Sequence, residues 1–201
     1  MSKLSRYFII GLFVIMIPTI FIVNLANAEE KQYYVGVGGS YIFTNFSYGD
    51  VVDWDSYTWG GNAKLGYRLA RTLYLQLDAD YVSKVDGVLK SDPSVGGDVE
   101  VFTGILSLKG YFPNFTIIRP FVIAGAGIMH YNVDYNDTAQ SAGFPLPDDK
   151  ETDLCFKVGG GVDFFINDIV SLGIEGNYTG GLEEVKDVKY INVSAGINFY
   201  F

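Results

Sequence analysis

The sequence has 201 residues, of which 49% are hydrophobic and 16% aromatic, and its formal net charge is −9. A chain this acidic has no electrostatic basis for binding nucleic acid. The single cysteine, Cys155, excludes an internal disulfide framework, and 24 glycines without any long amphipathic helical pattern favour an all-β protein.

The N-terminus has the pattern of a secretory signal peptide. Lys3 and Arg6 precede an apolar run from Tyr7 to Val23, and the run is followed by the small-residue site Ala26-Asn27-Ala28. We therefore expect residues 1–28 to be a signal peptide cleaved after Ala28. The alternative is a retained membrane anchor, because the run is near the lower length limit for crossing a bilayer. Cleavage leaves residues 29–201 as one domain, with 12 cations, 23 acids and a net charge of −11.

Eight segments with period-two alternation follow in chain order, which is the periodicity of β-strands. We expect strands over Gln32–Thr44, Tyr57–Arg68, Leu73–Ser83, Val99–Phe112, Phe121–Tyr131, Leu154–Ile166, Val170–Thr179 and Val188–Phe201.

The connections between these segments alternate in length. The short ones are Leu69–Thr72, Pro113–Pro120 and Asn167–Ile169. The longer ones are Asn45–Ser56, Lys84–Asp98, Asn132–Asp153 and Gly180–Asp187. This asymmetry is typical of outer-membrane barrels, in which short turns face the periplasm and longer loops face outward.

Each segment has an apolar face and a polar face. In the third, Leu75 and Leu77 alternate with Gln76 and Asp78. A soluble sandwich, or a lipocalin-like carrier with an apolar cavity, would show the same alternation. Segment length and two groups of aromatic residues near the segment ends favour lipid on the apolar side. The first group is Tyr33, Tyr67, Tyr111, Phe112, Phe121, Phe164, Phe199 and Phe201, and the second is Tyr41, Phe43, Trp54, Tyr57, Trp59, Tyr81, Phe102 and Tyr178.

The polar faces place four cations and four anions inside such a barrel. They are Lys64, Arg68, Asp78, Asp80, Lys109, Lys157, Asp163 and Glu175. Because eight strands leave room only for side chains and unpaired buried charges are costly, we expect an ion-pair network that fills the lumen. The alternative is a gated narrow pore. Glycines leave the facing of residues 99–131 open.

Four stretches carry a resemblance to a known family: the A-x-A site, "YYVGVGGSYIF", "RPFVIAGAGI" and the final "INFYF". The chain resembles the small outer-membrane β-barrel family that includes opacity-like proteins and the OmpA transmembrane domain. The resemblance implies an eight-stranded antiparallel up-and-down transmembrane β-barrel in the bacterial cell outer membrane. It also implies that Ile197, Phe199 and Phe201 belong to a signal read by the barrel-assembly machinery. Hydrocarbon cannot satisfy an open sheet edge, so the last strand should pair with the first.

No catalytic constellation is found. Lipid A deacylases of this architecture use a His-x-Ser arrangement, but the single histidine, His130, has Asn132 where that serine would be. We expect no enzyme activity and no cofactor. The external loops are acidic and aromatic, but they lack the spacing of an EF-hand calcium site, so no metal site is predicted. Their marker residues are Trp54, Asp134, Asp148, Asp149, Glu183 and Glu184.

The function favoured by these observations is a structural or surface-interaction role, with adhesion among the candidates, performed through four external loops. The expected partners are outer-membrane lipid, lipopolysaccharide and the assembly machinery, and the expected state is a monomer. A ligand for the loops, from a host or another surface, is not specified by the sequence. A low-conductance pore is the second hypothesis and a soluble carrier is the third.

Overall fold

The computed structural model describes residues 31–44, 52–54, 57–89, 92–113, 117–135, 150–182, 185 and 188–201. Nine strands occupy nearly all of this part of the chain. They are β1 (Tyr33–Thr44), β2 (Val52–Trp54), β3 (Tyr57–Ala70), β4 (Leu73–Leu89), β5 (Asp92–Tyr111), β6 (Ile118–Tyr135), β7 (Lys150–Phe165), β8 (Val170–Gly181) and β9 (Lys189–Tyr200). Within the described ranges, no helix has the length and apolar character needed to cross a membrane.

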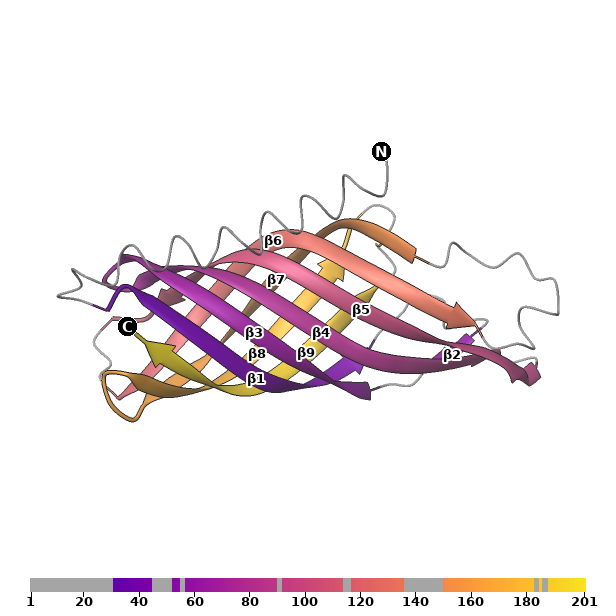
Figure 1. Cartoon of the computed structure of the whole chain (residues 1–201), viewed down its shortest axis with the longest axis horizontal. Helices are drawn as coiled ribbons and strands as arrows, with labels where there is room; N and C mark the ends of the chain where they lie inside the picture. The colour runs from indigo at the N-terminus through magenta and orange to yellow at the C-terminus, as the bar shows by residue number, and fades with distance from the viewer. Residues whose placement is uncertain are drawn as a thin grey trace. The chain divides into compact units, whose positions relative to one another are not determined.

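Eight of the strands close into an antiparallel barrel (Figure 1). Neighbours in sequence pair around the ring, β4 pairs with β5, and the ring closes where β1 pairs with β9 from Tyr34↔Tyr200 to Thr44↔Tyr190. The predicted pairing of the last strand with the first is therefore confirmed. Closure leaves no open edge along the ring, as a hydrocarbon environment demands.

The strands β4 and β5 are longer than the sequence pattern predicted. The expected loop over Lys84–Asp98 is mostly strand: pairing continues from Val85↔Val99 to Gly87↔Gly97, after a register shift between Val82 and Val85. The Asp and Gly residues in this segment favour turns, so the sequence pattern predicted a loop. Val85 and Val99 nevertheless continue the inward apolar face of the two strands.

Two residues assigned to external loops lie instead in strands. Trp54 ends the short strand β2, which pairs with the extension of β4 at Gly87. Asp134 lies near the end of β6, opposite Asp98 of β5. Both corrections have the same cause, because the lengthened β4–β5 hairpin offers pairing partners that period-two counting over each segment alone does not reveal.

Apolar side chains cover the outside of the barrel. Trp59 is 68% exposed, Val37 is 58% exposed and Ile128 is 55% exposed. The strands whose facing the sequence left open follow the same rule: Phe102 and Leu106 of β5 point outward, and Ile105 points inward. An outer surface of this kind is the reverse of a soluble carrier's.

Two aromatic residues predicted to belong to an interfacial belt are inside. Tyr111 and Phe121 are 8% and 3% exposed and pack in the lumen. The prediction was wrong for these two because it rested on closeness to a segment end, which does not determine the face of the strand. Tyr67, Phe164 and Phe199 do point outward at the same end.

Candidate functional site: the charged interior of the barrel

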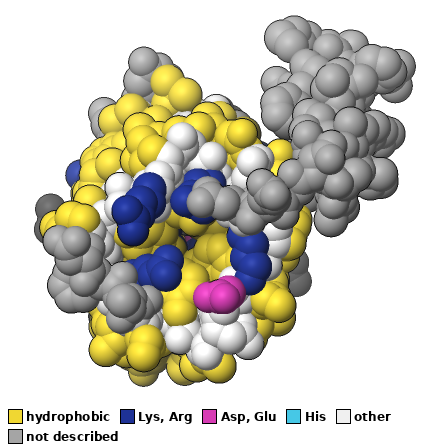
Figure 2. Space-filling view, turned by 90° about the vertical axis from the view of Figure 1, so that its left-hand side faces the viewer, with side chains coloured by type: hydrophobic (Ala, Val, Ile, Leu, Met, Phe, Trp, Pro, Cys, Tyr) yellow, Lys and Arg dark blue, Asp and Glu magenta, His cyan; other side chains and the backbone are white. Residues whose placement is uncertain are grey.

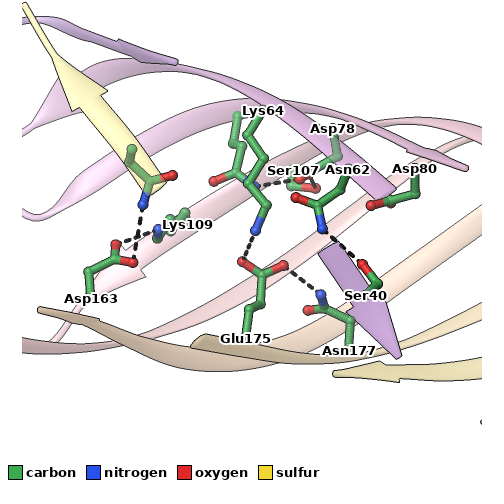
Figure 3. Close-up of polar contacts among 12 residues, drawn as sticks. Ser40, Asn62, Lys64, Asp78, Asp80, Ser107, Lys109, Asp163, Glu175 and Asn177 are labelled. Atoms are coloured by element: carbon green, nitrogen blue, oxygen red, sulfur yellow. Dashed lines mark hydrogen bonds and ion pairs between the residues drawn. The ribbon is translucent and has the colours of Figure 1, made fainter. Parts of the chain in front are cut away.

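The first buried ion pair joins β5 to β7. The Lys109 Nζ lies 2.7 Å from Asp163 Oδ2, and both side chains are almost fully buried (Figure 3). Asp163 also accepts hydrogen bonds from the Tyr111 hydroxyl and, at 3.4 Å, from Asn198 Nδ2. Lys109 lies 3.9 Å from the centroid of the Phe121 ring, a cation–π distance. Each charge therefore has several partners, which offsets part of the cost of removing it from water.

The second pair crosses the lumen from β3 to β8. Lys64 Nζ lies 2.7 Å from Glu175 Oε2, and the other carboxylate oxygen accepts a hydrogen bond from Asn177 Nδ2. To the right of this pair in Figure 3, Asn62 Nδ2 donates to Ser40 Oγ at 2.9 Å. Lys64 and Glu175 are 111 residues apart in sequence, so only closure of the barrel brings them together.

A third cation, Lys157, serves two carboxylates. Its Nζ lies 3.0 Å from Asp80 Oδ2 and 3.4 Å from Asp78 Oδ1, and all three side chains are buried. Asp78 additionally accepts hydrogen bonds from Gln76 Nε2 and from the Ser107 hydroxyl. Neutral donors thus compensate for the excess of acid over base at this level of the lumen.

Seven of the eight predicted lumen charges meet in these three groups. The eighth, Arg68, lies half-buried near the end of β3, opposite Tyr74. The period-two pattern predicted which residues face inward, but it contains no information on which cation meets which acid.

Sequence reasoning missed two apolar clusters that flank the charged zone. At the end with the short connections the cluster is aromatic, and its members are Tyr34, Tyr74, Tyr111, Phe121, Ile123 and Tyr200. At the opposite end it is mainly aliphatic, and its members are Ile42, Val82, Val85, Val99, Val101, Ile105, Met129, Cys155, Val185 and Tyr190. Inward-facing rings at the short-connection end and the run of inward-facing valines were the available signals.

Glycines make room for the aromatic cluster. A Cβ on Gly66 would meet the ring of Tyr34, which comes from the neighbouring strand and is itself fully buried. The Tyr34 hydroxyl donates to Gln76 and so connects this cluster to the charged zone. A small polar cavity of about 10 Å³ remains in the middle of the lumen, lined among others by Lys64, Asp163 and Glu175. That volume corresponds to about one water molecule.

The remaining predicted residues lie away from the lumen. His130 Nδ1 is 2.7 Å from the Thr152 hydroxyl on β7, and within the described residues no group of three or more His, Cys, Asp or Glu side chains is placed to hold a metal ion. Of the assembly-signal residues, Phe199 is exposed on the outer face and Ile197 is partly exposed. Asp148, Asp149, Glu183 and Glu184 lie outside the described residues, and so do residues 1–28, the segment expected to be a signal peptide.

Comparisons with known proteins agree with this architecture. A family model described as the outer membrane protein beta-barrel domain matches residues 13–201. No curated protein matches the chain by sequence.

Solved structures of similar fold come from several bacteria. Neisserial surface protein A is 20% identical with a TM-score of 0.59, and the match covers 84% of this chain and 97% of that one. Ail, the attachment invasion locus protein of Yersinia pestis, is 13% identical with a TM-score of 0.55, over 86% and 99%. OprG of Pseudomonas aeruginosa is 13% identical with a TM-score of 0.56, over 85% and 96%. At these identities the likeness concerns the fold alone.

Proposed function

This chain belongs to the outer membrane protein beta-barrel domain family, and we propose from this premise that it is a non-conducting barrel that makes surface contacts through its longer connections. The protein resides in the bacterial outer membrane, with lipid against its outer face. The observation that carries the proposal is the filled lumen: three ion-paired groups lie between two apolar clusters, and the cavity among them is about 10 Å³.

The filled lumen argues against steady conduction. An ion would have to displace the aliphatic cluster and then pass charges that already have partners at 2.7–3.4 Å. Planar-bilayer recording of the purified protein tests this directly, and we expect no steady current. A reproducible single-channel current would refute the proposal and favour the narrow pore.

The pore remains the second candidate because of one specific feature. Lys64, Glu175 and Asp163 line the central cavity, so a rearrangement of the Lys64–Glu175 pair would enlarge a polar space that already exists. Recording the Lys64→Gln variant beside the Asn62→Ala variant separates the candidates, because both residues line the cavity and only Lys64 takes part in an ion pair. A current specific to Lys64→Gln would support a gate.

The surface role involves connections whose composition is acidic. Asp50, Asp53, Asp55, Asp148 and Asp149 lie in or beside the longer connections. Ail has been solved in complex with a heparin analogue, sucrose octasulfate, but an acidic surface repels such a polyanion. We therefore propose that adhesion by this chain, and its contact with lipopolysaccharide, require a cationic partner or bridging divalent cations. Measuring cell attachment with and without EDTA distinguishes these routes. Loss of attachment in EDTA would indicate bridging divalent cations, and unchanged attachment would indicate a cationic partner.

The proposal includes a defined topology and maturation. Short connections face the periplasm, and residues 1–28 are removed after Ala28. Surface proteolysis of intact cells should cut only in the longer connections, and cleavage within Asn167–Ile169 would refute the orientation. N-terminal sequencing of the protein from the outer membrane should begin at Glu29, and a sequence beginning at Met1 would favour the retained anchor.

The outward positions of Phe199 and Ile197 on β9 support the proposed assembly signal. Phe201 continues the same alternation in the sequence, and the assembly machinery would read this pattern before closure. Replacing Phe199 with Ser should lower the amount of folded protein in the outer membrane. The same Ser replacement at the outward Ile191, which lies on the same strand but far from its C-terminal end, should have a smaller effect.

A further inference from the structure

The charged zone of the lumen contains more acids than cations among the residues that the structure describes. Its ammonium groups are Lys64, Lys109 and Lys157, and its carboxylates are Asp78, Asp80, Asp163 and Glu175. The cations Arg68 and Arg119 lie half-buried at the short-connection end, where dark-blue side chains surround a hollow (Figure 2). Arg68 pairs with Tyr74 and Asn62 pairs with Asp80, so these two levels are about 20 Å apart along β3. The arginines are therefore too distant to balance a charge at the level of Asp80.

Asp78 and Asp80 share one ammonium group. They are next-but-one neighbours on β4 and both point into the lumen (Figure 3). Lys157 Nζ lies 3.0 Å from Asp80 Oδ2 and 3.4 Å from Asp78 Oδ1. The other donor to Asp80 is the Thr103 hydroxyl, at the long distance of 3.4 Å. Two carboxylates that share a site repel each other, and a proton on one of them removes the repulsion.

The other three carboxylates have better donors than Asp80. Asp163 and Glu175 each have an ammonium nitrogen at 2.7 Å that no other carboxylate contacts in the described structure. Asp78 accepts two hydrogen bonds from neutral side chains in addition to its contact with Lys157. Asp80 is therefore the carboxylate that gains most from a proton.

Two buried hydroxyl groups beside Asp80 need hydrogen-bond partners. Tyr190 on β9 is 2% exposed, its hydroxyl lies beside those of Thr103 on β5 and Thr179 on β8, and Asp80 is within electrostatic range. Within the described residues, neither the Tyr190 hydroxyl nor Thr179 Oγ1 has a hydrogen-bond partner. Thr103 uses its single hydroxyl hydrogen on the Asp80 carboxylate. A protonated Asp80 reverses that contact, and the hydrogen of Thr103 becomes free for Tyr190.

We propose that Asp80 is a proton-binding site inside the barrel, which the folded protein holds as the carboxylic acid in neutral buffer. The proton comes from water, and it leaves three carboxylates facing three ammonium groups. The titratable groups that face this site are Asp78 on β4, Lys157 and Cys155 on β7, Tyr190 on β9 and Lys64 on β3. The site goes beyond the proposed surface role and does not depend on it.

Infrared spectroscopy of the folded barrel in lipid vesicles tests the site. A protonated carboxyl group has a C=O stretching band that a carboxylate lacks, and isotope-labelled aspartate assigns the band to an aspartic acid. In neutral buffer the wild type should show this band, and Asp80→Asn should lose it. The matched control, Asp98→Asn, changes an acid outside the lumen and should keep it. Thr103→Val removes the hydrogen-bond acceptor and should move the band to higher frequency.

Amide substitutions provide an independent measurement. Asparagine has the shape of protonated aspartic acid and also donates a hydrogen bond, so Asp80→Asn should change the equilibrium constant for unfolding in urea by less than about tenfold. Asp163→Asn removes the counter-ion of Lys109 and should raise this constant about a hundredfold or more.

The proposal is overturned if the wild type lacks the band, if the band persists in Asp80→Asn or if it disappears in Asp98→Asn. Failure of Asp80→Asn to fold, or a loss of stability equal to that of Asp163→Asn, would also overturn it, because both results would show that the Asp80 charge is needed.

Discussion

Removing one charge from the Lys109–Asp163 pair should destabilise the barrel more than removing both. The Lys109→Met change leaves the Asp163 carboxylate buried with only the Tyr111 and Asn198 donors, and Asp163→Asn leaves the Lys109 ammonium buried without its counter-ion. Breaking a buried pair in this way costs about 3–5 kcal/mol, whereas replacing both members is often nearly neutral. We therefore expect each single variant to lose about 3 kcal/mol and the double variant to be more stable than either.

The exposed pair Lys84–Asp98 provides the control. Its N···O distance is 3.1 Å, close to that of the buried pair, but its side chains are 52% and 34% exposed. A double-mutant cycle there should give a coupling energy below about 1 kcal/mol.

The measurement for both cycles is urea unfolding in lipid vesicles, followed by tryptophan fluorescence, with gel mobility to confirm that each variant folds. If the losses at Lys109 and Asp163 simply add, the two residues do not act as a pair and the reasoning fails. A coupling energy as large at Lys84–Asp98 as at the buried pair would show that burial is not the cause.

Three further predictions concern packing and the solvent on each side of the wall. Gly66→Ala should destabilise the barrel by about 1–3 kcal/mol because its Cβ would meet the buried Tyr34 ring, whereas Gly176→Ala enters open space and should change the free energy of unfolding little; urea titration compares them. Ile174→Arg places a cation on the lipid face and should cost about 2–4 kcal/mol, less if the residue lies near an interface; the folded fraction in vesicles measures this. The buried Cys155 thiol should resist a water-soluble maleimide until urea unfolds the barrel, and rapid labelling of the folded protein would contradict its placement.

The barrel itself could be predicted because its periodicity is local information. Leu77 and Asp78 point to opposite sides of β4 wherever that strand lies, and the two solvents then decide which side each residue occupies. The same reasoning predicted Lys64 and Glu175 as lumen residues. Periodicity could not predict that these two residues form an ion pair, because β3 meets β8 only across the closed lumen. The distance between the Lys64 ammonium and the Glu175 carboxylate depends on the register of every intervening strand.

Aromatic residues and strand ends were the less predictable features. Tyr111 and Phe121 are aromatic residues near strand ends, as interfacial belt residues are, but they lie in the aromatic cluster inside the lumen. Only the strand register determines whether such a residue faces lipid or the lumen. The extension of β4 and β5 was not predicted from the sequence, for a different reason. Pairing partners on two neighbouring strands, such as Trp54 and Asp134, stabilise a segment whose own composition favours turns.

The long β4–β5 hairpin has a mechanical consequence. With 17 and 20 residues these strands exceed the 12 residues of β1, β8 and β9, and each additional residue adds about 3.4 Å of length along the strand. Backbone pairing with β2 on one side and β6 on the other stiffens this ribbon. With the longer connections outside the cell, as proposed, this ribbon extends the barrel wall outward as a stiff unit, so a force applied to its described outer part passes through backbone hydrogen bonds to the rest of the ring.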